Sequence, residues 1–79
     1  MDLLASLSVE NVLFHFYYRK IALADTAKYF IKAVGTNNES TSFEMKKNKN
    51  DRWEIIPPVP QKFLQVQAQL EQLLQQHGH

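Results

Sequence analysis

The chain has 79 residues, carries nine basic and eight acidic side chains for a net charge of +1, and contains no cysteine. This length predicts a single domain over residues 1–79 with a thin core, which leaves little room for a deep catalytic cleft. The missing cysteines exclude disulfides and thiolate metal sites and suit a cytoplasmic protein, and the near balance of charge disfavours a dedicated nucleic-acid binder.

Residues 2–8 predict a short N-terminal helix or arm. Leu3, Leu4 and Leu7 would share one face of a helix, and Asp2 would lie at its N-terminus, where negative charge is favoured. About two turns are too short to be stable alone, so the segment has to dock on the rest of the domain. The apolar stretch Leu3–Leu7 is too short for a signal peptide, and no run approaches the roughly 18 apolar residues of a membrane span, so no membrane contact is expected.

Residues 12–34 allow two interpretations. The aromatic and β-branched residues of Val12–Tyr18 favour a strand, with His15 and Tyr17 on the face opposite Phe14 and Phe16. A helix also fits this apolar run, because short apolar runs are not resolved by period alone. A helix that ends at Gly35 likewise competes with a strand over residues 29–34. In the helical alternative, one face collects Leu7, Phe14, Tyr17, Tyr18 and Ile21.

The stretch from residue 28 to residue 60 predicts three short strands followed by a stiff corner. In residues 29–34, 41–46 and 52–56 alternate side chains form two faces, one mostly apolar and one with the charged residues, and turns rich in Asn, Asp and Ser separate the segments. Pro57, Pro58 and Pro60 cannot donate ladder hydrogen bonds, so the sheet ends there. The side chains expected to face inward are Tyr29, Ile31, Phe43, Met45, Trp53 and Ile55.

A helix is predicted from Gln61 to about Gln76. Its apolar residues form one stripe at heptad spacing, but two heptads are too few for an isolated coiled coil, so the stripe is expected to pack on the sheet, with a dimer or partner contact as the alternative. The predicted fold class is therefore α+β: an antiparallel sheet of three to four strands with a C-terminal helix on one face and a short N-terminal helix or arm. The buried set also includes Phe14, Phe16, Phe63, Val66, Leu70 and Leu73.

The run Trp-Glu-Ile-Ile-Pro-Pro-Val-Pro after a hairpin, followed by a closing helix, resembles the ending of some small uncharacterised bacterial α+β proteins. The resemblance covers about residues 28–76. It implies a fold and no activity.

No catalytic, cofactor or metal site is predicted. The serines lie in capping, turn or strand contexts, and with two glycines in the chain there is no phosphate-cradling loop. His15 has no acid near it in sequence, and His77 and His79 lack the further ligands that a metal site needs.

The predicted function is a non-catalytic protein-interaction module that binds a protein partner or a second copy of itself. The apolar residues left over for such a surface are Tyr17, Phe30, Ile56 and Leu64. The alternative is a weak nucleic-acid-binding domain that uses the lysine-rich region around residues 28–52. Its phosphate contacts would be Lys28, Lys32, Lys46, Lys47, Lys49 and Arg52.

Overall fold

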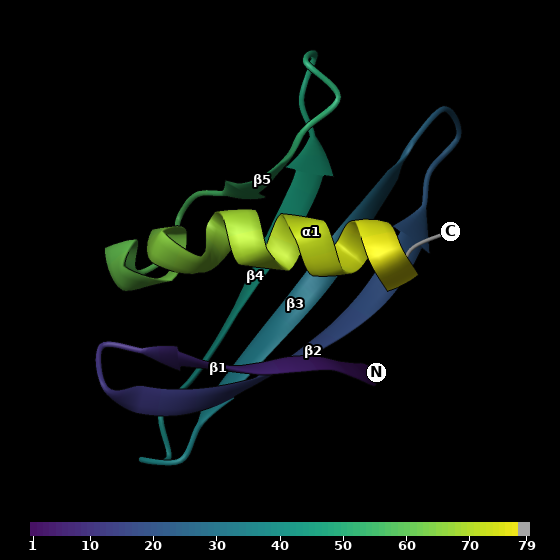
Figure 1. Cartoon of the computed structure of the whole chain (residues 1–79). Coiled ribbons are helices and arrows are strands. Elements are labelled where there is room, and N and C mark those ends of the chain that lie inside the picture. Colours follow the sequence, from purple (N-terminus) through teal and green to yellow (C-terminus); the bar gives the residue numbers. More distant parts are fainter. Residues whose placement is uncertain (78–79) are drawn as a thin grey trace.

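A computed structural model describes residues 1–77 of the chain. Each strand of its single sheet pairs antiparallel with the next strand along the sequence, and the helical segment lies across one face (Figure 1). A 3-10 helix leads directly into the α-helix. The elements are β1 (Asp2–Val9), β2 (Val12–Ala22), β3 (Ala27–Gly35), β4 (Ser40–Lys47), β5 (Trp53–Ile56), η1 (Gln61–Val66) and α1 (Gln67–His77).

The predicted fold class is wrong in two respects. The sheet has five strands rather than three to four, and residues 2–8 belong to strand β1 instead of a helix, so the molecule is mostly sheet. The reason is a β-bulge, since the register of β1 against β2 shifts between Leu3 and Ala5. The shift buries Leu4 three residues before the half-buried Leu7, and this spacing imitates a helical period.

A two-residue turn joins β1 to β2. Glu10 and Asn11 both have positive φ, at 49° and 67°, which a type I′ turn requires. Such a turn matches the twist of the strands it connects and sets the register that pairs Val9 with Val12. The strand prediction for Val12–Tyr18 is confirmed, and β2 runs on to Ala22 without a break. Residues 27–35 are also a strand, which excludes both helical alternatives.

The inner face of the sheet and the apolar stripe of the helical segment form the core. Of the twelve side chains expected to be buried, Trp53 and Leu73 are only half-buried, although both pack against the core, and Leu74 is buried more deeply than Leu73. Leu4 and Val9 of β1 join the core because that segment is a strand. The full buried apolar set is Leu4, Val9, Phe14, Phe16, Tyr29, Ile31, Ala33, Phe43, Met45, Ile55, Phe63, Val66, Leu70 and Leu74.

Phe63 is the point where η1 meets the sheet. Its ring lies 5.1 Å from the ring of Phe14 and 6.1 Å from that of Phe16, both in edge-on geometry, and 5.9 Å from that of Phe43. Edge-on contacts at these separations stabilise aromatic pairs beyond the burial of their area. Phe63 therefore packs η1 against three rings contributed by β2 and β4.

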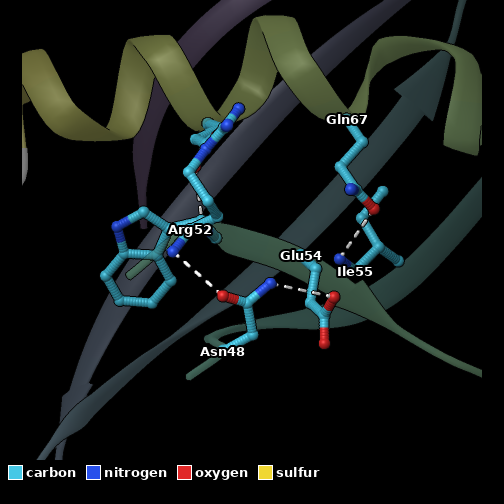
Figure 2. Close-up of polar contacts among 7 residues, drawn as sticks. Asn48, Arg52, Glu54, Ile55 and Gln67 are labelled. Carbon is cyan, nitrogen blue, oxygen red and sulfur yellow. Dashed lines mark hydrogen bonds and ion pairs between the residues drawn. The ribbon is translucent and has the colours of Figure 1, made fainter. Parts of the chain in front are cut away.

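Two polar side chains of α1 bind the free edge of β5, and Figure 2 shows the contact of Gln67 with Ile55. The backbone N–H of Ile55 donates to Gln67 Oε1 at 3.0 Å, and the N–H of Trp53 donates to Glu71 Oε2 at 2.8 Å. Gln67 and Glu71 are four residues apart on the helix, a rise of about 6 Å, and Trp53 and Ile55 are two residues apart on the strand, a rise of about 6.6 Å. The spacing of the two acceptors therefore matches the spacing of the two N–H groups. The edge-facing N–H groups of β5 are thus satisfied by the helix instead of by another strand.

Glu71 is the buried charged side chain among the described residues, with 5% of its surface exposed. Arg52 donates to both of its carboxylate oxygens, from Nε at 2.9 Å and from Nη2 at 2.7 Å. The Arg52 hydrogen bond, helped by the Trp53 N–H, lowers the pKa of Glu71 although burial opposes the shift. The same contact raises the pKa of Arg52. The carboxylate is therefore held charged as part of the link between helix and sheet.

Candidate functional site

The face of the sheet opposite the helical segment has no described element of the chain over it (Figure 1). Strand alternation directs every second side chain onto this open face. The cross-strand register then decides which of them become neighbours. Tyr17 of β2 lies opposite Leu3 of β1 and Lys32 of β3, and Phe30 of β3 lies opposite Arg19 of β2 and Glu44 of β4.

Five apolar side chains on β1, β2 and β3 are neighbours on the open face, and we call them the open-face cluster. Tyr17 is diagonal to Phe30 and Val34, which flank its partner Lys32 on β3, and diagonal neighbours on a sheet lie within reach of aromatic side chains. Phe30 is in turn diagonal to Ile21. Four members are half-buried, whereas Leu3 is 58% exposed. The open-face cluster consists of Leu3, Tyr17, Ile21, Phe30 and Val34.

Positive charge surrounds the open-face cluster. The Lys28 ammonium pairs with Glu44 at 3.1 Å, which neutralises both side chains. Among residues 1–77, Arg19, Lys32 and Lys46 make no ion pair, and the first two lie directly opposite Phe30 and Tyr17. The open face thus combines an aromatic centre with unpaired cations.

The predicted interaction residues do not form one surface. Tyr17 and Phe30 come together in the open-face cluster. Ile56 points to the same face, but Glu44 of β4 separates it from Phe30. Leu64 is 46% exposed and belongs to η1, where it lines a shallow hollow with Glu10, Gln61, Lys62 and Gln65 away from the open face.

The predicted phosphate contacts are also dispersed. Lys47 pairs with Asp51 at 3.1 Å, and its ammonium lies 5.7 Å from the centre of the Trp53 ring, on the helix side of the sheet. Arg52 is bound to Glu71, and Lys28 is paired on the open face. Half of the six cations are therefore engaged by carboxylates. Lys32 and Lys46 remain on the open face, and Lys49 lies in the turn between β4 and β5.

A hydrogen bond of 2.7 Å joins Ser6 Oγ and His15 Nδ1, which are cross-strand partners on the open face. Nucleophilic catalysis needs such a pair together with an orienting group and donors for the developing oxyanion. Within the described part of the chain, no third group is hydrogen-bonded to His15. The contact serves here as a polar link between β1 and β2.

A hollow of about 660 Å³ opens on the helix side, between the β2–β3 loop, the β4–β5 turn and the end of α1. Lys20, Tyr29, Lys47, Trp53 and Leu74 contribute to its lining. Burial, followed by the neighbouring Tyr18, raises the pKa of the Tyr29 hydroxyl. Over residues 1–77 no three His, Asp or Glu side chains are grouped as metal ligands, and no helix in that range is long and apolar enough to span a membrane.

Leu3 and Val34 belong to the candidate surface, although the sequence did not predict them as members. Alternation placed Val34 on the outward side of its strand, but only the register shows that it flanks Tyr17. The sequence predicts a short helix or arm for the segment that contains Leu3, and nothing in that segment indicates that Leu3 lies opposite Tyr17. His79 lies outside the described residues, and of His77 only the backbone is described.

No family model, curated protein or solved structure matches the chain.

Proposed function

We propose that this domain is a non-catalytic module that binds another protein through the open-face cluster. The observation that carries the proposal is the position of Tyr17 and Phe30 as diagonal neighbours on a sheet face that no described element covers. Aromatic side chains are enriched in protein interfaces, where they bury a large area at low conformational cost. Both rings are half-buried by their neighbours, so they are already held in place for a partner.

Charge defines the kind of partner that fits this surface. Arg19 and Lys32 border the two rings without a carboxylate of their own. A partner segment with apolar residues flanked by Asp or Glu would complement both features, and such complementarity selects partners and accelerates association. The expected ligand is therefore an acidic, partly apolar protein segment.

Selection from a random peptide library displayed on phage tests this proposal. We expect peptides enriched on the immobilised domain to combine apolar and acidic residues, and their binding to be lost in Phe30→Ser, because the contact lies at the centre of the surface. Leu64→Ser is the control, since Leu64 is also an apolar surface side chain, 46% exposed, but lies on η1. Enriched peptides that bind Phe30→Ser as tightly as the native domain would refute the assignment.

Single-stranded nucleic acid is the second candidate ligand. Arg19 and Lys32 beside two aromatic rings are the combination that such ligands use for phosphate contact and base stacking. The candidate ranks lower because three of the six cations proposed for it are held in ion pairs. It predicts that the affinity for a labelled oligonucleotide falls steeply with salt, and fluorescence anisotropy without a binding curve at low salt would eliminate it.

A further inference from the structure

The two edges of the sheet differ in how they are protected. An edge strand exposes unpaired backbone groups, and proteins normally cover such edges or interrupt them with charge or proline. At β5, Gln67 and Glu71 bind the edge-facing N–H groups, Arg52 and Glu54 supply charge, and the strand has only four residues. Pro57 and Pro58 follow directly. No further strand can join at this edge.

The β1 edge lacks these protections. The segment Leu3–Val9 contains no charged residue and no proline. In a two-residue hairpin the flanking pair, Val9 and Val12, is hydrogen-bonded, so alternate residues back along β1 turn their backbone groups toward the free edge. Those residues include Ser6 and Ser8, and both are exposed. Across residues 1–77, no hydrogen bond from outside the β1–β2 ladder reaches the β1 backbone.

We infer that the segment Ala5–Val9 pairs antiparallel with the same segment of a second copy of this chain, about a two-fold axis at Leu7. The segment is the regular part of β1, bounded by the bulge on one side and by the hairpin turn on the other. It is self-complementary in this register. Leu7 faces Leu7, Ser6 faces Ser8, and Ala5 faces Val9, so small or apolar side chains meet and no like charges oppose one another.

A second copy fits this edge better than an unrelated strand because the segment is complementary to itself. Each of Ser6 and Ser8 presents a backbone donor and acceptor to its counterpart, so the two-fold arrangement satisfies both chains equally. The half-buried Leu7 becomes covered by its symmetry mate. The two five-stranded sheets join into one, with both open-face clusters on the same side. This inference is independent of the ligand proposed for that face.

Light scattering across protein concentrations up to about 1 mM tests the pairing. We expect the native chain to reach twice the monomer mass of 9.2 kDa. Ser6→Pro removes an N–H that faces the edge and leaves the ladder to β2 intact, so it should be monomeric. Ser6→Ala is the control, because it loses the bond to His15 but keeps the backbone donor, and it should remain a dimer. A monomeric native chain, or a dimer that persists in Ser6→Pro, overturns the inference.

Disulfide trapping decides the register even if Ser6→Pro does not fold. Because the chain has no cysteine, a single introduced thiol can cross-link only between copies. Residues directly opposite one another on paired strands lie within the Cα separation that a disulfide spans. Under mild oxidation, Leu7→Cys should form a covalent dimer at least about tenfold faster than Leu64→Cys, which exposes its thiol on η1. Equal rates in the two variants exclude pairing about Leu7.

Discussion

Removing the Glu71 carboxylate should weaken the attachment of α1 to β5 by a predictable amount. In Glu71→Ala the Trp53 N–H loses a charged acceptor at 2.8 Å, and hydrogen bonds to charged groups contribute about 1.5–3 kcal/mol to stability. The Arg52 contact adds little, because its side chain is 65% exposed and solvent screens the pair. We therefore expect a loss of about 2 kcal/mol. A domain of this size has a total stability of only about 4–12 kcal/mol.

Urea denaturation followed by tryptophan fluorescence measures this loss, since Trp53 is the only tryptophan and lies at the perturbed site. With a slope of about 1 kcal/mol per molar urea, the midpoint should fall by roughly 2 M. Glu54→Ala is the matched control, because Glu54 lies on the same strand but is exposed and accepts only a 3.3 Å bond from Asn48. It should shift the midpoint by less than about 0.5 M. Equal shifts in the two variants would refute the structural role assigned to Glu71.

Further predictions concern the titration of Glu71 and substitutions of Phe63 and Gly35 in the core. The lowered pKa of Glu71 means that its stabilisation is complete above the ordinary carboxyl value of 4.5 and is lost as the pH falls through the lower folded value. Denaturation at several acidic pH values should show a shallower loss for Glu71→Gln than for the native chain, and parallel curves would contradict this. Phe63→Ala should lower the free energy of unfolding by about 3–5 kcal/mol, because three rings lose their common neighbour. The helical segment should then pack poorly on the sheet, which would weaken the helical signal in far-ultraviolet circular dichroism. A native-like melting curve would argue against that packing. In Gly35→Ala the new Cβ would lie 2.9 Å from Phe14 Cε1 and 2.5 Å from Asn37 Oδ1, so we expect a loss of about 1–3 kcal/mol in thermal unfolding. An unchanged melting temperature would show that these neighbours move aside freely.

The strands of residues 40–56 were predictable because each has one buried face and one face with the charged residues, whereas for residues 29–34 the sequence also allowed a helix. Phe43 and Met45 alternate with polar residues, whereas Tyr29 and Ile31 alternate with Lys28, Phe30 and Lys32, and the period of two follows directly from strand geometry. The strand β1 was not predictable in this way, because the bulge between Leu3 and Ala5 breaks its period of two. With Leu4 and Leu7 both turned inward, the local spacing fits a helix as well as a strand.

The polar contacts between α1 and β5 could not be predicted from the sequence for a different reason. Gln67 lies in a segment rich in glutamine, and nothing in its neighbourhood separates it from the exposed amides around it. Glu71 carries a weak signal, since it is the sole acidic residue after Pro60 and adjoins the buried Leu70. Alternation along each strand predicts which side chains lie on the open face. It does not predict which of them are neighbours of Tyr17, because that depends on the register between strands, which the turns set.

The order of the strands has a consequence for the way this chain reaches its native state. Every ladder of the sheet joins consecutive strands, so four hairpins can close one after another across short connections. Loop-closure entropy is small for such steps, and topologies dominated by local contacts fold quickly. The exception is the contact of η1 and α1 with β1, which joins residues 2–9 to residues 61–77. That closure has the largest sequence separation and the highest entropic cost. β1 therefore depends on synthesis of residues 61–77 to complete its packing, and a ribosome-bound chain that lacks this helical segment would carry an uncovered sheet.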